Sequence, residues 1–332
     1  MFNTKYYRTL DDTYGYEQLD FKLGKIDSRF LQTKFCSHQE GDKFAEAFKE
    51  GASCIVTTGI GLSGIPHIGT ISQIMRAIYL QEAGLKVQFV LGDLDSYNSR
   101  NKSLTSVEKM AEKYISFIVA LGFDVKKGIL RTQSQELKVL KTQYLISRCL
   151  KDEDFDKTEE DLSEFYKSEG IYSGIVFPVK QSILLMIADF VHLGMEENYS
   201  HVLAMLGIEE HKYALLAREV IKRLNLSMHL GAIYSKVIGG LGGYSKMSKS
   251  IPGSGITADM TSEKIRNLVL NCEEKYSTPE QSVVYQMMSS ASYYTASDIH
   301  NIYQACQAGG TSWQKYKSNY ADELIEICKK WK

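Results

Sequence analysis

The stretch 54–75, CIVTTGIGLSGIPHIGTISQIM, constrains the fold more than any other part of the chain. Ile55 and Val56 begin a short apolar run typical of an interior strand, and three glycines within six residues then end that pattern. Isoleucines at helical spacing resume behind Pro66. The pattern therefore predicts a buried strand, a glycine-rich turn and a helix that begins at His67.

The glycine-rich turn is a candidate phosphate site. Glycine tolerates positive φ and lets a ligand approach bare backbone, while the first turn of a helix offers N–H groups and the positive end of the dipole. The string Gly-x-Gly-x-x-Gly occurs here, but the Pro-His behind it does not fit a dinucleotide fingerprint, and no Walker Gly-Lys-Ser/Thr is present. A purely structural turn is the alternative interpretation.

A second motif lies about 180 residues downstream, where Lys246-Met247-Ser248-Lys249-Ser250 follows four glycines and precedes IPGSGI. A loop rich in Gly and Ser that carries two lysines is cationic and mobile, and alone it would be interpreted as a solvated surface loop. In combination with PHIG behind a strand, the loop resembles the KMSKS signature of class I aminoacyl-tRNA synthetases, and PHIG resembles their HIGH signature. The two signatures bracket one ATP in that family.

This resemblance implies an α/β fold: a Rossmann-like doubly wound parallel sheet with a small C-terminal all-helical domain. It implies ATP with Mg²⁺ as substrate and requires no bound cofactor or structural metal. The implied catalytic residues are His67, Lys246 and Lys249. The implied ATP-binding residues are Gly59, Gly61, Pro66, Gly69, Thr70, Met247, Ser248 and Ser250.

The chemistry of amino-acid activation suits these residues. A carboxylate attacks the α-phosphorus of ATP, and pyrophosphate leaves with charge that develops only in the transition state, so catalysis depends on positioning and positive charge. His67 can hydrogen-bond a phosphate or ribose oxygen. Lys246 and Lys249 can approach the departing pyrophosphate on their loop. None of the three has to act as a nucleophile.

The chain is similar to the tryptophanyl/tyrosyl branch over nearly its whole length. FPVKQ resembles the Tyr-Pro-x-x-Gln helix of that branch, and YEQLDFKLGKIDSRFL with FCSHQEGD resembles the N-terminal part of archaeal and eukaryotic tryptophanyl-tRNA synthetases. The resemblance places the amino acid against Thr57, Gln181, Leu184 and Glu210. The partners it implies are ATP, an amino acid and tRNA, in a homodimer.

Several positions depart from the family pattern. Thr70 replaces the last histidine of HIGH, and Thr57 stands where a tyrosine is frequent. Leu184 stands where many relatives have an aspartate that reads a ring N–H or O–H, and Glu210 replaces a glutamine, although a first-turn acid favoured by the helix dipole is an equal alternative for Glu210. We therefore favour tryptophan or a related aromatic substrate. A paralogue that activates another, apolar amino acid, or a silent ligand-binding homologue, is the alternative.

Length and composition limit the number of domains and the class of protein. The 332 residues, 44% apolar and 24% charged, suffice for one large or two moderate domains, and six scattered cysteines without CxxC spacing indicate a cytoplasmic protein without structural zinc. No apolar run has the length of a membrane span, so no membrane partner is expected. We predict an appended segment at 1–50, a catalytic domain at 51–255 with an acidic insertion near 151–170, and a helical domain at 256–332.

The net charge of −1 limits tRNA binding to a local patch. The acidic residues of 151–169 repel phosphate and indicate a solvated insertion. In contrast, residues 311–332 interleave lysines with Trp313, Tyr316 and Trp331, as single-stranded nucleic acid requires, although an amphipathic helix with a buried aromatic face is the more ordinary interpretation. Lys329, Lys330 and Lys332 are the remaining candidates for tRNA contacts.

Overall fold

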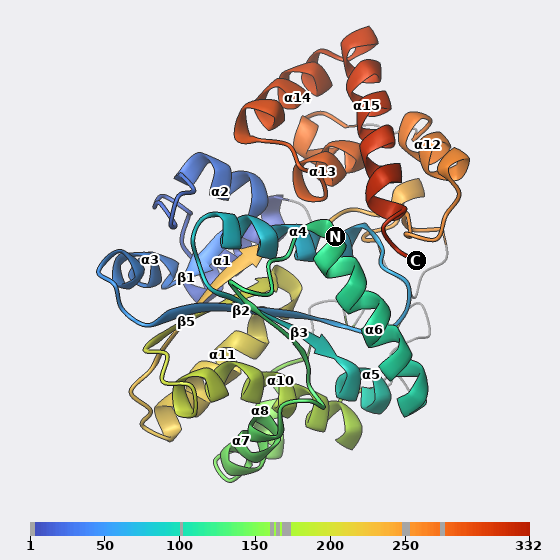
Figure 1. Cartoon of the computed structure of the whole chain (residues 1–332). Helices are drawn as coiled ribbons and strands as arrows, with labels where there is room; N and C mark the ends of the chain where they lie inside the picture. The colour runs from blue at the N-terminus through green and yellow to red at the C-terminus, as the bar shows by residue number, and fades with distance from the viewer. Residues whose placement is uncertain are drawn as a thin grey trace.

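A six-stranded sheet in the order β1-β6-β5-β2-β3-β4 is the centre of the computed structural model, which describes residues 4–99, 102–159, 163, 167, 174–247, 253–272 and 276–332 (Figure 1). The strands are β1 (Ser37–Gln39), β2 (Cys54–Gly61), β3 (Val87–Gly92), β4 (Ile129–Thr132), β5 (His201–Gly207) and β6 (His229–Ser235). β2 to β6 pair in parallel, which confirms the predicted sheet. β1 pairs antiparallel with β6 at the edge, and neither of these two strands was predicted.

The strand predicted to lie in the interior, β2, is central. It pairs with β3 on one side and β5 on the other, and its Ile55 and Val56 are fully buried against opposite faces of the sheet. β2, β3 and β5 all end in glycine, at Gly61, Gly92 and Gly207. Because the carboxyl ends of parallel strands meet at one edge of a sheet, these three ends define the place where a ligand is expected.

Helices cover both faces of the sheet, as a doubly wound fold requires (Figure 1). One core contains residues from α3 (Gly41–Lys49), α4 (Ile68–Glu82) and α6 (Leu104–Leu121). The other contains residues from α7 (Leu137–Ser147), α10 (Phe177–Met195) and α11 (His211–Arg223). Ser103 caps α6, because its Oγ accepts from the N–H of Ser106 at 3.3 Å.

The N-terminal segment is part of the main core. It contains α1 (Thr4–Tyr14) and α2 (Ser28–Lys34), and the carboxylate of Asp27 caps α2 by accepting from the N–H of Phe30 at 2.8 Å. Leu19, Leu23 and Leu31 are buried with residues of α4 and the sheet. The segment predicted as an appendage therefore belongs structurally to the sheet layer.

The C-terminal region is helical, as predicted. It contains α12 (Ser262–Leu270), α13 (Val283–Ser290), α14 (Ala296–Ala308) and α15 (Gly310–Cys328), which lie above α4 in Figure 1. A 3₁₀ turn, Pro279–Gln281, precedes α13. The aromatic residues of the tail are used for packing: Trp313 is buried, and the ring of Trp331 lies 4.9 Å from that of Tyr114 on α6. The amphipathic interpretation of this tail is therefore confirmed.

The first, described part of the acidic stretch forms a short helix with buried residues. In α8 (Asp152–Asp156), Asp154 and Phe155 are buried, and both carboxylate oxygens of Asp154 accept from Arg223 at 2.6 and 2.8 Å. That ion pair lowers the pKa of Asp154 to about 2. The prediction of a solvated face was wrong for Asp154 and Phe155, whereas residues 160–162, 164–166 and 168–173 lie outside the described part of the chain. Among the helices that are described, none is long and apolar enough to cross a membrane.

Candidate active site

A cavity of about 520 Å³ opens at the carboxyl edge of the sheet. Its walls come from the end of β2, the start of α4, the helix α5 (Asp93–Ser99), α10, the turn after β5 and the segment after β6. This volume lies within the range of small-molecule sites. The cavity is located where the three glycine-ended strands meet.

Most predicted site residues converge on this cavity. The lining includes Thr57, Gly59, Gly61, His67, Gly69, Thr70, Glu210, Lys246 and Met247. The two sequence motifs are thus brought together from positions nearly 180 residues apart. Pro66, Gln181 and Leu184 are not among the lining residues, and Ser248, Lys249 and Ser250 lie outside the part of the chain that the structure describes.

His67 caps the helix that it begins. Its Nδ1 accepts from the N–H of Gly69 at 2.9 Å, so this ring nitrogen is engaged by the first turn of the helix. A Cβ on Gly69 would lie 2.6 Å from Cε1 of the ring, which explains why glycine is needed there. The N–H of Ile68 donates to the carbonyl of Ile256 at 3.2 Å. The expectation that this helix start leaves its N–H groups to a ligand is therefore wrong for residues 68 and 69.

The glycines of the turn are required for close approach. Neither Gly59 nor Gly61 has positive φ, contrary to the expectation from the sequence. A Cβ on Gly59 would lie 2.6 Å from the carbonyl oxygen of Val90 on the neighbouring strand, and one on Gly61 would lie 3.3 Å from the carboxylate of Asp95. Asp95 lines the cavity and was not predicted.

Pro66 joins the two motifs through its backbone. Its carbonyl accepts from the N–H of Ala258 at 2.8 Å, and Ile256 bonds Ile68. Residues 256–258 follow the second motif in the sequence, and these two hydrogen bonds fix them to the start of α4.

The basic side chains of Lys246 and Arg76 line the cavity together with the carboxylate of Glu209. Lys246 Nζ lies 3.8 Å from Glu209 Oε1, and both side chains are largely buried. Arg76 of α4 is 3% exposed and also lines the cavity. Burial lowers the pKa of Arg76 to about 10, so the guanidinium stays protonated at neutral pH. Arg76 and Glu209 were missed because neither belongs to a motif.

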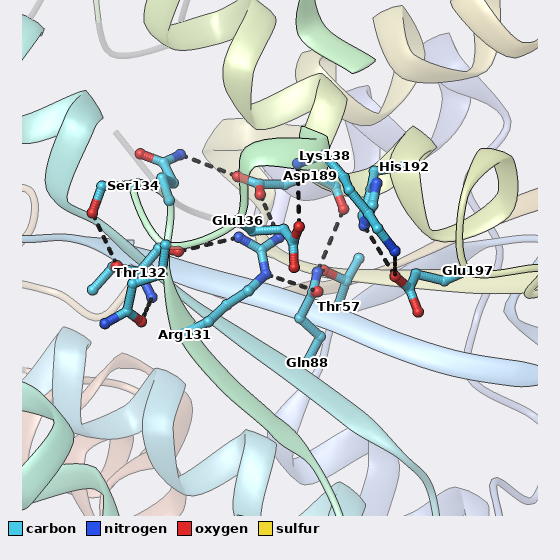
Figure 2. A network of polar contacts seen from close by, with 12 residues as sticks. Thr57, Gln88, Arg131, Thr132, Ser134, Glu136, Lys138, Asp189, His192 and Glu197 are labelled. Atoms are coloured by element: carbon cyan, nitrogen blue, oxygen red, sulfur yellow. Dashed lines mark hydrogen bonds and ion pairs between the residues drawn. The ribbon is translucent and has the colours of Figure 1, made fainter. Parts of the chain in front are cut away.

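A buried polar network closes another side of the cavity (Figure 2). Arg131 on β4 donates to the carboxylate of Asp189 on α10 at 2.6 Å and to Gln88 Oε1 on β3 at 3.2 Å. Gln88 Nε2 in turn donates to the hydroxyl of Thr57 on β2 at 3.0 Å, and Gln133 Nε2 donates to Asp189 at 3.1 Å. Burial raises the pKa of Asp189, and the positive charge of Arg131 opposes that rise. The network thereby fixes Thr57 against the cavity.

The face of α10 that lines the cavity does not contain Gln181 or Leu184, the two residues that the sequence placed against the amino acid. Gln181 Oε1 accepts from Gln143 Nε2 of α7 at 3.2 Å, and Leu184 is 5% exposed within the core. Val179, Ser182 and Met186 face the cavity instead. The three- and four-residue spacing from Val179 to Met186 would have placed Ser182, and not Leu184, on the face of α10 that lines the cavity.

All six cysteines are free thiols. No group of three or more His, Cys, Asp or Glu side chains among the described residues could hold a metal ion. The carboxylates that line the cavity, Asp95 and Glu209 among them, could approach a magnesium ion that enters with a ligand.

The fold resembles that of several solved structures. The tryptophanyl-tRNA synthetase of Aeropyrum pernix K1 superposes with a TM-score of 0.80 at 23% identity, over 98% of this chain and 92% of that one. The tyrosyl-tRNA synthetase of Archaeoglobus fulgidus superposes with a TM-score of 0.74 at 18% identity, over 91% and 97% of the two chains.

Sequence comparison agrees. Among curated relatives, the tryptophan–tRNA ligase of Methanocaldococcus jannaschii is 22% identical over 97% of this chain and 90% of its own length, and that of Methanopyrus kandleri is 24% identical over 97% and 88%. The family model for class I tRNA synthetases (W and Y) matches residues 49–329, which include both motifs and the cavity. The chain therefore belongs to the class I aminoacyl-tRNA ligases of the tryptophan and tyrosine branch.

Proposed function

We propose that the protein activates an aromatic amino acid, with tryptophan favoured, to its aminoacyl adenylate and transfers the aminoacyl group to tRNA. One observation carries the proposal: a single cavity combines His67 and Lys246, from the two sequence motifs, with apolar residues of α10 along another wall. The tryptophan–tRNA ligases that match over 97% of the chain support the choice of substrate.

ATP would lie over the end of β2 and the start of α4. Gly59, Gly61, Gly69 and Thr70 would contact it there, and His67 would hydrogen-bond a phosphate or ribose oxygen through Nε2. Lys246 would leave Glu209 as pyrophosphate charge develops, because a charge donor that binds more strongly in the transition state accelerates the step. We assign Lys249 the same role and Met247, Ser248 and Ser250 to the closing loop.

The amino acid would occupy the space between Thr57 and α10. The negative charge of Glu210, which lines the cavity, suits the α-ammonium group. We retain Gln181 as a second candidate for the ammonium, although it must leave Gln143 to reach the cavity, and Leu184 as part of the wall behind the side chain. Attack by the substrate carboxylate on the α-phosphorus then yields adenylate and pyrophosphate, and no protein nucleophile is required.

We further propose a cytoplasmic homodimer. Large apolar side chains are exposed along α7 and the start of α10: Leu137 is 72%, Tyr144 80% and Phe177 72% exposed. Two of them lie seven residues apart on α7, hence on one face of the helix. A second copy of the chain would cover this surface.

ATP–pyrophosphate exchange across a panel of amino acids tests the proposed activation. Exchange with tryptophan supports the proposal. Exchange with only a different, apolar amino acid would support a paralogue outside ordinary translation, for which the motivation is the departures at Thr57 and Leu184. No exchange with any amino acid would indicate a silent ligand-binding homologue.

A further inference from the structure

The cavity-facing side of α10 is apolar with two exceptions. The residues that line the cavity from this helix are Val179, Ser182, Ile183, Met186, Asp189 and Phe190. They recur at intervals of three and four and so form one helix face. Such a wall suits an apolar or aromatic side chain, and its two polar residues therefore need an explanation.

The carboxylate of Asp189 has hydrogen-bond partners within the protein. One carboxylate oxygen accepts from Arg131 at 2.6 Å and the other from Gln133 Nε2 at 3.1 Å. The neighbouring hydroxyl of Thr57 is likewise held, because it accepts from Gln88 Nε2. Both groups are satisfied before any ligand arrives.

Ser182 differs from both. The residue is 8% exposed, and its Oγ is buried without a hydrogen-bond partner within the described part of the chain. A buried helical serine commonly donates to the carbonyl four residues before it. That carbonyl, of Pro178, instead accepts from Asn98 Nδ2 at 2.8 Å. A buried hydroxyl left unsatisfied destabilises the protein, so a hydroxyl of this kind on a cavity wall points to a ligand.

We infer that Ser182 hydrogen-bonds a polar atom on the side chain of the amino-acid substrate. The inference rests on the proposed function and specifies the substrate class: an aromatic amino acid whose ring bears an N–H, an O–H or an acceptor. A hydroxyl both donates and accepts, so any of these atoms satisfies it. A purely hydrocarbon side chain leaves Ser182 unsatisfied and binds less tightly.

The test compares wild type with Ser182→Ala in ATP–pyrophosphate exchange. The substrates are tryptophan, tyrosine, phenylalanine and benzothienylalanine, in which sulfur replaces the indole N–H. We expect kcat/KM for the preferred polar substrate to fall roughly 10- to 100-fold in the variant, because the polar atom of the substrate is left buried without a hydrogen-bond partner. The value for the hydrocarbon analogue should stay constant or rise.

Ser72→Ala is the matched control. Ser72 is also a buried helical serine whose Oγ has no partner among the described residues, but it lies on α4 and does not line the cavity. Both variants should raise the melting temperature of the ligand-free protein, because each removes an unsatisfied hydroxyl. Only Ser182→Ala should change selectivity.

The outcomes separate the inference from the proposed function. An equal fall in kcat/KM for all four amino acids, or no change, overturns the role of Ser182 while exchange itself upholds activation. If the wild-type protein catalyses no exchange, the proposal that it activates an amino acid fails. The role of Ser182 is then tested by thermal shift, which measures how much each of the same amino acids stabilises the wild type and the variant. Loss of the shift with the polar amino acids alone supports the inference, whereas equal shifts or none overturn it.

Discussion

The two sides of the cavity are built in different ways. The side that faces ATP in our proposal consists mainly of backbone: a strand end, a glycine turn and a helix start, from residues 59–76, with Lys246 added from the second motif. The side that faces the amino acid consists of side chains from β2, β3, β4 and α10, joined by the network around Asp189 (Figure 2). A site made of local backbone is specified by adjacent residues, whereas a site made of side chains depends on the whole sheet being assembled.

The largest effect should follow from breaking the buried pair on the amino-acid side. Asp189→Ala leaves the charge of Arg131 buried without its partner, and we expect a loss of roughly 3–5 kcal/mol in the free energy of unfolding, measured by urea denaturation. Asp152→Ala is the control, since Asp152 pairs with Lys180 but is 86% exposed, and its loss should be below about 1 kcal/mol. Similar losses in the two variants would refute the distinction.

On the ATP side, the largest effect should be kinetic. Lys246→Ala should lower the rate of adenylate formation roughly 10²- to 10³-fold with little change in ATP affinity, because the lysine acts on charge that develops in the transition state. Single-turnover kinetics and nucleotide binding measure the two quantities. Lys127→Ala, an exposed lysine paired with Asp124, serves as control. Equal losses in affinity and rate would mean that Lys246 only binds the ground state.

A smaller effect should follow from moving the histidine ring. In Gly69→Ala the new Cβ would lie 2.6 Å from Cε1 of His67, so the ring must shift, and exchange should fall roughly 10- to 100-fold. Alanine in a helix is stabilising by about 0.5–1 kcal/mol, which offsets the loss of a cap worth about 1 kcal/mol, so the melting temperature should change little. Unchanged exchange would show that the position of the His67 ring does not matter.

Gln181 offers a sharper comparison within α10. If it binds the α-ammonium group, Gln181→Ala should raise KM about 5-fold for every accepted amino acid alike, which corresponds to one hydrogen bond of about 1 kcal/mol. Gln143→Ala removes its partner in the structure and should not raise KM. A loss confined to one amino acid, or an unchanged KM in Gln181→Ala, would remove this role.

The smallest effect concerns tRNA. Replacing Lys329, Lys330 and Lys332 by alanine should weaken tRNA binding and reduce its salt slope by at most about three charges, with adenylate formation unchanged. The contribution should be partial, because Lys329 Nζ lies 2.7 Å from Glu326 and Lys330 Nζ donates to the Tyr293 hydroxyl at 3.0 Å. Filter binding at several salt concentrations measures the slope, and an unchanged slope would place the tRNA contacts elsewhere.

The sequence was informative where structure is local. The stretch 54–75 predicted β2, the turn and α4, because strand period, glycines and helix period follow one another within twenty residues. β1 was missed because its three residues, Ser37–Gln39, show no alternation and their partner strand, β6, lies far away in the sequence. The link from Gln88 to Asp189 was also missed, since its members are up to 101 residues apart and each appears as an isolated polar residue in an apolar element.

Binding of a hydrolysis-resistant tryptophanyl-adenylate analogue tests most directly the claim that both sides of the cavity hold one reaction intermediate. Isothermal titration calorimetry would compare the sulfamoyl analogue with tryptophan and AMP separately. We predict that the analogue binds on the order of 10²-fold or more tighter than either part, because joining two ligands makes the second contact intramolecular. An affinity no higher than that of the better single part would contradict the account.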